Sequence, residues 1–308
     1  MKISIVTPTF NEIDNIENLY LEIKKELDKL EYEYEHLIID NNSTDGTIDK
    51  IKHLASKDKN LKIIINSKNY GHIRSPFYGL LQTKSDASIL MASDFQDPID
   101  LIPKYIEEWK KGKKIVLGEK TSSEENQIKY SVRTLFYNFL NKISEFELPK
   151  NTTGSGIFDK TILDKLKKIN DPYPYFRGLI TELGEDISTI KFKQPARKSG
   201  KTKNSIFTLY DIGMLGLVKH SRKPLRFMTL LGFFASLVSF IVGIIYLFYK
   251  LLFWNSFTLG IAPIVIGIFI VSSIQITLLG LVGEYIGIIL LHQRNMPLVI
   301  EKERINFD

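Results

Sequence analysis

Short apolar runs alternate with amphipathic stretches over the first 120 residues. Five runs rich in branched apolar residues are expected as strands, at Ile3–Thr7, His36–Asp40, Leu61–Asn66, Ala87–Ala92 and Lys114–Gly118. Between them, apolar positions three and four residues apart predict helices at Asn15–Leu30, Thr44–Lys57, Ile73–Thr83 and Leu101–Lys111. This alternation is typical of an α/β fold, a parallel sheet with helices on both faces, whose ligands bind at the carboxyl ends of the strands.

Two long apolar segments follow in the last third of the chain. Phe227–Tyr249 and Leu251–Gly283 contain no charged residue, and each exceeds the roughly 20 residues that a helix needs to cross a bilayer. A buried core helix is the alternative reading. Two such runs in tandem far exceed ordinary buried helices, so the pattern favours two transmembrane helices.

Positive charge gathers directly before these segments. Residues 191–226 include ten Lys or Arg and one acidic residue, within a net charge of +6. Beside apolar segments, such charge favours anionic lipid head groups over nucleic acid. Arg226 precedes the first segment, Arg294 follows the second, and only Lys250 lies between them. The positive-inside rule then places both chain ends in the cytosol.

The chain is therefore expected in five parts. These are an α/β domain at 1–205, a basic amphipathic juxtamembrane segment at 206–226, transmembrane helices at 227–250 and 259–291, and a cytosolic tail at 292–308. Within the domain, 128–143 is expected as a helix, 151–156 as a polar turn and 195–203 as a basic loop. The first residues have strand character rather than that of a secretory signal, which favours a cytosolic domain. The absence of cysteine excludes disulfides, zinc–thiolate sites and thiol catalysis.

Three polar loops follow predicted strands: Thr7–Glu12, Asp40–Gly46 and the acidic cluster Asp94–Asp97. Each loop alone is typical of an ordinary strand-to-helix turn. Together, at the carboxyl ends of three strands, they predict one crevice in which carboxylates hold a divalent cation against a diphosphate. The first strand is not followed by a Gly-x-Gly-x-x-Gly motif, and the chain has no Walker loop.

The combination resembles a known family. Thr7-Pro-Thr-Phe-Asn-Glu12, Ile39-Asp-Asn-Asn-Ser-Thr-Asp-Gly46, Asn69-Tyr-Gly71 and Asp94-Phe-Gln-Asp-Pro98 are similar to motifs of family 2 glycosyltransferases, which have the GT-A (Rossmann-like) fold. With the basic stretch Arg197–Thr202 and two C-terminal spans, the chain most resembles the polyprenyl-phosphate subgroup. That subgroup includes dolichol-phosphate mannose synthase and bacterial undecaprenyl-phosphate glucosyltransferases.

The resemblance implies roles for individual residues. Nucleotide binding would fall to Pro8, Thr9, Glu12, Asp40, Asn69 and Gly71. Asp94 and Gln96 match positions that bind Mg²⁺ or Mn²⁺ and the donor diphosphate. Ala92 stands where the fullest motif has a further Asp, and Asp97 is a candidate third ligand. Arg133 and Lys120 would hold the acceptor phosphate, and Arg197 and Lys201 would act catalytically by stabilising charge on the leaving diphosphate.

The implied activity is metal-dependent hexosyl transfer with inversion, from a UDP- or GDP-sugar to polyprenyl (undecaprenyl) phosphate, for modification of cell-envelope glycans. The enzyme would be a multi-pass protein of the bacterial cytoplasmic membrane, and some members of the family form homo-oligomers. Transfer to another lipid or to a polysaccharide is an alternative, although the chain lacks the Gln-x-x-Arg-Trp motif of polysaccharide synthases. A second alternative, a non-catalytic membrane scaffold, has Ala92 as its one support. The sequence does not reveal which sugar is transferred, whether the donor carries uracil or guanine, or how long the isoprenoid chain of the acceptor is.

Overall fold

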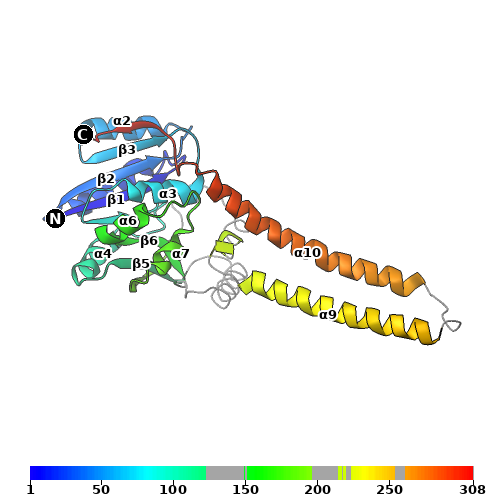
Figure 1. The fold of residues 1–308 in the computed structure, drawn as a ribbon. Helices are drawn as coiled ribbons and strands as arrows, with labels where there is room; N and C mark the ends of the chain where they lie inside the picture. Colours follow the sequence, from blue (N-terminus) through cyan, green and yellow to red (C-terminus); the bar gives the residue numbers. More distant parts are fainter. Residues whose placement is uncertain are drawn as a thin grey trace.

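A mixed eight-stranded sheet between two layers of helices forms the body of the protein (Figure 1). The computed structural model describes residues 1–122, 149, 151–195, 214–216, 218–219, 223–253 and 261–307. Within these ranges the strand order is β7-β5-β6-β4-β1-β2-β3-β8. The strands are β1 (Lys2–Thr9), β2 (Glu33–Asp40), β3 (Leu61–Asn66), β4 (Ala87–Leu90), β5 (Ile115–Ser122), β6 (Thr152–Asp159), β7 (Ile187–Lys193) and β8 (Glu301–Ile305).

Each face of the sheet has its own hydrophobic core. Helices α1 (Ile16–Leu27), α2 (Thr47–Lys57) and α4 (Leu101–Lys110) contribute to one core. Helices α3 (Gly71–Leu81), α6 (Lys160–Lys167) and α7 (Phe176–Glu182) contribute to the other. The α/β prediction is confirmed, and the five strands and four helices expected before residue 120 form within a few residues of their predicted bounds.

The alternation of strands and helices predicts a parallel sheet, but the observed sheet is mixed. Strands β1 to β4 are parallel, but β6 runs antiparallel to both β4 and β5. The expected polar turn at 151–156 is wrong, because most of it belongs to β6. A Cβ atom on Gly156 would lie 2.2 Å from the Val116 carbonyl oxygen, so this glycine reflects close approach of two strands rather than a turn.

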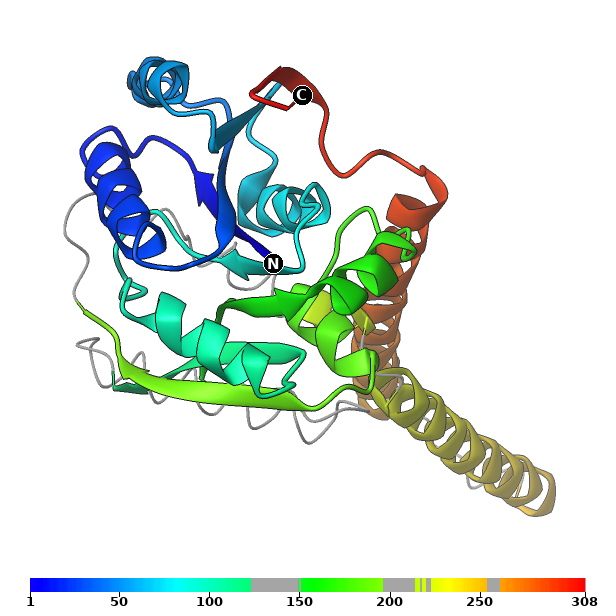
Figure 2. The ribbon, with the colours of Figure 1, turned by 90° about the vertical axis from the view of Figure 1, so that its left-hand side faces the viewer.

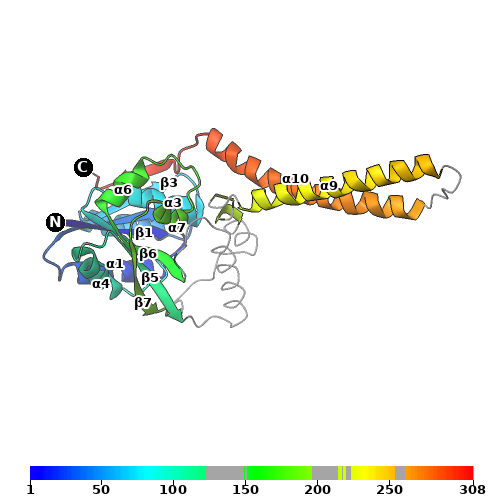
Figure 3. The same ribbon diagram turned by 60° about the horizontal axis from the view of Figure 1, so that its bottom comes forward.

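Two long helices, α9 (Lys223–Leu252) and α10 (Ile261–Gln293), leave the same end of the α/β domain (Figures 1 and 3). Many of their apolar side chains are exposed. The first predicted apolar segment is thus helical, and the second is helical from Ile261 onward, while its residues 254–260 lie outside the described ranges. Among the described residues, one helical stretch, Ile274–Gln293, is long and apolar enough to cross a membrane. The predicted helix at 128–143 lies outside the described residues, as do residues 196–203 of the basic loop and most of 206–220.

The chain returns to the sheet after α10. Figure 2 shows the C-terminal segment lying along one edge of the sheet. Strand β8 pairs there antiparallel with β3, with Ile305 opposite Ile63. The Asn306 amide nitrogen then donates to the Ala55 and Leu61 carbonyls (2.9 and 2.8 Å). The segment expected only as a tail at 292–308 therefore supplies β8, one of the two edge strands of the described sheet.

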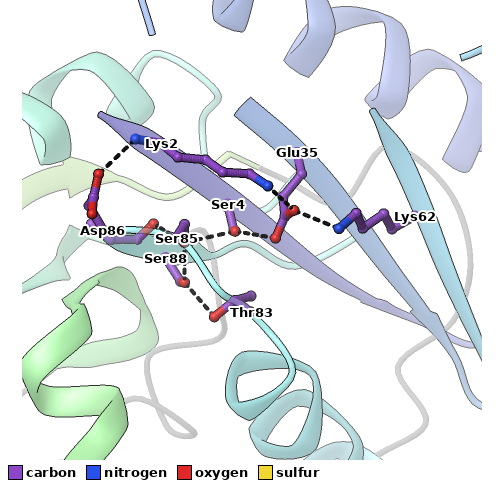
Figure 4. A network of polar contacts seen from close by, with 9 residues as sticks. Lys2, Ser4, Glu35, Lys62, Thr83, Ser85, Asp86 and Ser88 are labelled. Atoms are coloured by element: carbon purple, nitrogen blue, oxygen red, sulfur yellow. Dashed lines mark hydrogen bonds and ion pairs between the residues drawn. The ribbon is translucent and has the colours of Figure 1, made fainter. Parts of the chain in front are cut away.

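An ion-pair network around the buried Glu35 carboxylate joins the amino-terminal ends of β1, β2 and β3 (Figure 4). The Glu35 carboxylate, in β2, lies 2.7 Å from Lys2 Nζ in β1 and 2.9 Å from Lys62 Nζ in β3. The Ser4 hydroxyl donates to the same carboxylate (2.7 Å). Burial alone would raise the pKa of Glu35, but these three partners outweigh burial and lower it.

Glu35→Gln should lower the free energy of unfolding by about 1–3 kcal/mol at pH 7, because it leaves the Lys2 and Lys62 charges uncompensated. A carboxyl group whose pKa is lower in the folded state than in the unfolded state stabilises the fold fully above its unfolded-state pKa. This stabilisation is lost as pH falls through the folded-state pKa. Thermal unfolding in detergent should therefore show a gap between wild type and variant that closes between about pH 5 and pH 3.

The control for this prediction is Glu26→Gln, which removes the more exposed Glu26–Lys29 pair. That pair should contribute no more than about 0.5 kcal/mol. Equal melting temperatures for the two variants at pH 7 would contradict the assigned contribution of Glu35.

Candidate active site

Three loops follow β1, β2 and β4 at the carboxyl ends of these parallel strands. Parallel register places Thr9 opposite Asp40, the last residues of β1 and β2, and Val6 opposite Leu90 in β4. The Asn41 amide continues this pairing by donating to the Thr9 carbonyl (2.9 Å). The loops that carry the polar motifs therefore begin close together at the carboxyl end of these strands, where ligands of such sheets bind.

The loop after β1 is joined to the loop after β2 and the start of α2 by hydrogen bonds between backbone amides and side-chain oxygens. Asn11 has a left-handed φ of 55°, a conformation that Asn tolerates well. Its amide donates to Ser43 Oγ, and its side-chain oxygen accepts from the Thr44 amide (both 2.8 Å). The Glu12 amide donates to Thr47 Oγ1 (3.1 Å). These bonds fix the two loops as a single unit.

Four predicted nucleotide-binding residues lie on this unit. Pro8 is partly exposed, whereas Thr9, Glu12 and Asp40 are buried. Asp40 accepts from the amide and the hydroxyl of Ser43 (2.8 and 2.6 Å), but burial still raises the pKa of its carboxyl. Thr9 Oγ1 has no hydrogen-bond partner within the described part of the chain. Asp40 thus holds the conformation of its loop through Ser43. On the neighbouring strand, the Thr9 hydroxyl lacks a hydrogen-bond partner within the described residues.

The predicted segment at 69–71 is attached to the same edge through Asn41. The Asn41 side chain donates to the Gly71 carbonyl and accepts from the Tyr70 amide (both 3.1 Å). Asn66, at the end of β3, donates to the same Asn41 oxygen (2.8 Å). Asn69 accepts from the Gly71 amide (2.7 Å). Gly71 has a φ of 81°, which suits glycine, so this turn is locally encoded.

The acidic cluster forms a sharp turn directly after β4. Phe95 has a φ of 58° and is buried, while Asp94 and Gln96 on either side are partly exposed. Asp94 accepts from the Gln96 amide (3.2 Å). Asp97 is buried, and its Oδ2 accepts a hydrogen bond from the Ser155 hydroxyl in β6. The buried Phe95 side chain thus anchors the turn in the core, while Asp94 and Gln96 remain partly exposed at the carboxyl end of β4.

The electrostatics of this turn suit a bound cation. Burial raises the pKa of the Asp97 carboxyl, and the Asp94 charge raises it further against the opposing effect of Lys120. The Ala92 amide also favours the charged form, yet Asp97 Oδ1 has no hydrogen bond at good geometry among the described residues. A hard cation would satisfy such an oxygen. Within the described ranges, no group of three or more His, Cys, Asp or Glu side chains is arranged so that it could hold a metal ion.

Basic residues complete the predicted set. Lys120 lies in β5, its amide bonded to the Asn151 carbonyl (3.0 Å), close enough to the acidic turn for its charge to affect Asp97. Arg133, Arg197 and Lys201 lie outside the described residues. Of the predicted cations, the structure thus places Lys120 alone, beside the acidic turn.

Two contributors were not predicted from the sequence. Asn41 connects three strand ends, and its position directly after Asp40 in a polar loop was a usable signal. Ser155, which binds Asp97, lies in the stretch that had been interpreted as a turn. Its role depends on the pairing of β6 with β4, which no local pattern reveals.

Comparison with known proteins agrees with this geometry. Residues 4–167, just over half of the chain, match the model of glycosyl transferase family 2. The chain belongs to this family. A bactoprenol glucosyl transferase of Shigella phage SfX is 28% identical over 305 residues, covering 99% of this chain and 100% of that protein. The uncharacterized glycosyltransferase YkcC of Bacillus subtilis is 29% identical over 298 residues, covering 96% of this chain and 92% of that protein.

Solved structures support the fold assignment. Glucosyl-3-phosphoglycerate synthase from Mycobacterium tuberculosis, in complex with Mn²⁺, UDP-glucose and phosphoglyceric acid, superposes with a TM-score of 0.51 at 18% identity. The match covers 70% of this chain and 77% of that one. The resemblance to family 2 glycosyltransferases is therefore confirmed, and with it the GT-A fold.

Asp97→Asn should leave the melting temperature unchanged or raise it by a few degrees at pH 7. A carboxyl with a raised folded-state pKa destabilises the fold above its unfolded pKa, and the amide removes that charge. The difference from wild type should narrow as pH falls through the raised pKa of Asp97 and should be lost below about pH 4. Sugar transfer by the same variant should fall about 100-fold or more. Thermal scans and initial rates measure both effects.

Asp159→Asn provides the matched control. Asp159 caps α6 by accepting from the Thr161 amide, and it accepts from Trp109 Nε1 (both 2.8 Å). Burial would raise the pKa of Asp159, but these bonds outweigh burial and lower it. This variant should lose about 1 kcal/mol of stability and keep normal transfer. A clear loss of stability in Asp97→Asn would show that Asp97 is merely structural.

Proposed function

We propose that this protein is a membrane-anchored enzyme that transfers a sugar, with inversion, from a nucleotide sugar to polyprenyl phosphate. The observation that carries the proposal is the extent of similarity to bactoprenol glucosyl transferases. That similarity covers 99% of this chain, including both apolar helices, whereas the match to the solved synthase structure covers 70% of it. The helices are thus part of what the two proteins share, and they suit an acceptor that resides in a bilayer.

The acceptor chemistry fits the residues at the sheet edge. A phosphate monoester is ionised at pH 7, so it needs positioning more than a strong general base. One of its oxygens would bond to the anomeric carbon while the bond from that carbon to the nucleoside diphosphate breaks. Attack from the side opposite the leaving group inverts the configuration. Lys120 supplies a cation for an anionic reactant, and Arg133 is the second candidate from the sequence.

The donor would lie across the loops after β1, β2 and β4. Thr9, Asp40 and the segment at 69–71 border the nucleoside side, and the acidic turn borders the diphosphate side. Asp94 and Asp97 fit a divalent cation because two carboxylates share one turn and a buried Asp97 oxygen lacks a partner. Gln96 lies beside them. When bound, Mg²⁺ or Mn²⁺ would neutralise charge that develops on the leaving diphosphate. Arg197 and Lys201 remain sequence-based candidates for the same task.

Sheet topology supports a helical hairpin in the membrane. Strands β3 and β8 are paired in one sheet, yet both long helices lie between them in the chain. Paired strands must lie on the same side of a bilayer, so the chain between them crosses an even number of times. Spans near 227–250 and 259–291 satisfy this condition and leave the domain and both described chain ends on the same side of the bilayer. The positive charge at 191–226 favours the cytosolic side.

Purified protein in lipid nanodiscs, given undecaprenyl phosphate, Mg²⁺ or Mn²⁺ and a panel of UDP- and GDP-sugars, should yield a glycosylated lipid phosphate by mass spectrometry. Asp94→Asn should lower this turnover at least about 100-fold, even at saturating Mn²⁺, because the cation loses a carboxylate ligand. Asp100→Asn, at an exposed carboxylate paired with Lys104, is the control and should transfer normally. Most of the activity surviving in Asp94→Asn would remove that residue from the mechanism.

The hairpin generates an independent prediction. Reporter domains fused at residue 1 and after residue 308 should both report the cytosol. A reporter inserted at 255, between the helices, should report the opposite side of the membrane. Alkaline phosphatase and green fluorescent protein fusions measure the two locations. A cytosolic signal at 255 would mean that neither helix crosses, and the anchor assignment would then be wrong.

A further inference from the structure

Arg74, in the first turn of α3, reaches the linker that follows α10. Its Nε donates to the Leu298 carbonyl (2.8 Å) and its Nη2 to the Pro297 carbonyl (2.7 Å). The same guanidinium lies over the Tyr70 ring, 5.0 Å from the ring centroid. One side chain therefore joins the base of a long apolar helix to the residue at the centre of the 69–71 segment.

Tyr70 is held on its other sides by the sheet. Its amide donates to the Asn41 side chain (3.1 Å), and its hydroxyl lies 3.1 Å from Ser67 Oγ. Asn41 is itself bonded to the Thr9 carbonyl and to Asn66 at the end of β3. The ring is nearly buried. Lys68 Nζ, from the same loop, also lies over the ring, 5.2 Å from its centroid. Beyond this local contact, the 69–71 segment is fixed between two supports, the carboxyl end of the sheet through Asn41 and the linker through Arg74.

The linker at 294–300 is a firm support because it is fixed at both ends. Asn295 accepts from the Asn170 side chain (2.7 Å) just after α10, and the Ser67 amide donates to the Ile300 carbonyl (2.9 Å) just before β8. Val299 is buried between them. The orientation of the linker is consequently set by α10 on one side and by the sheet on the other.

The chemistry of this contact suits arginine specifically. A guanidinium is planar, so it can donate to two successive carbonyls while its face stacks on an aromatic ring. Lysine could keep the charge near the ring but could not hold both carbonyls in one plane. The acceptors are backbone oxygens, so the contact depends on the path of the linker rather than on its side chains.

We propose that Arg74 is a positioning residue for the donor nucleotide, coupling the 69–71 segment to the linker at the base of α10. The inference rests on the proposed function, since it takes this segment as one wall of the nucleotide site. Arg74 acts through Tyr70 and does not itself take part in bond formation. Its loss should weaken donor binding and leave the rate of the bound complex nearly unchanged.

The experiment compares full-length wild type, Arg74→Ala and Arg74→Lys in nanodiscs. Calorimetry with UDP or GDP, whichever the wild type binds in the presence of Mg²⁺, measures nucleotide affinity without any acceptor. Arg74→Ala should weaken this affinity and raise KM for the nucleotide sugar by roughly 5- to 20-fold, at the lower end of couplings between sites. Its kcat should stay within about twofold, as expected for lost ground-state binding. Arg74→Lys should recover part of the affinity.

Arg304→Ala is the matched control. Arg304 also stacks on a ring, Phe307 at 4.5 Å, and its guanidinium bonds to Gln82 and Glu301, but it lies in β8 away from the 69–71 segment. Arg304→Ala should lower the melting temperature without changing KM for the nucleotide sugar. If Arg74→Ala also lowers the melting temperature and leaves KM unchanged, Arg74 is structural and the inference is overturned. Should Arg74→Ala fail to fold, normal affinity in Arg74→Lys would equally overturn it.

The two levels of proposal fail in different ways. A wild type that binds nucleotide but does not glycosylate undecaprenyl phosphate contradicts the proposed acceptor, while the calorimetric comparison still decides the role of Arg74. A wild type that binds neither UDP nor GDP contradicts the donor assignment, and with it the inference.

Discussion

The parallel register of β1 with β2 and β4 is the constraint on which the rest of the site depends. A slip of one residue between two strands would turn every side chain to the opposite face of the sheet. It would separate Thr9 from Asp40 and shift the acidic turn after β4. The Lys2–Glu35–Lys62 network lies at the amino-terminal ends of β1, β2 and β3, where it favours the correct pairing of these three strands. Contacts at the amino-terminal ends of the strands thus stabilise the register on which the candidate site at their carboxyl ends depends.

Buried charge is treated differently at these two ends. Glu35 is surrounded by cations, and its pKa is lowered despite burial. Asp40 and Asp97 are also buried, yet their pKa values are raised because local hydrogen bonds do not compensate for the loss of water. The carboxyl-terminal end therefore carries unfavourable charge that a bound cation and nucleotide can offset. Such local destabilisation is expected where a protein binds ligands rather than where it only folds.

Local patterns predicted much of the fold and little of the long-range pairing. Periodicity located β1 to β5 and α1 to α4, because each element has an apolar face of regular spacing. It missed β6, since Gly154 and Gly156 suggested a turn while the true reason for Gly156 is a neighbouring strand. It missed β8 because an edge strand with exposed charged residues has no apolar signature. At the candidate site, motifs pointed to Asp94 and Asp97 as candidates, but the contact of Asp97 with Ser155 depends on the pairing of β6 with β4, which the sequence did not predict.

The position of β8 in the chain determines the order in which the domain can be completed. A ribosome synthesises β1 to β7 first, then α9 and α10, and only then the strand that covers the edge of β3. Until that moment β3 presents unpaired backbone groups, which are prone to pair with other chains. Arg74 likewise lacks its two carbonyl partners. A fragment cut before α9 would keep this open edge permanently, so the folded domain and the apolar helices form one unit of expression.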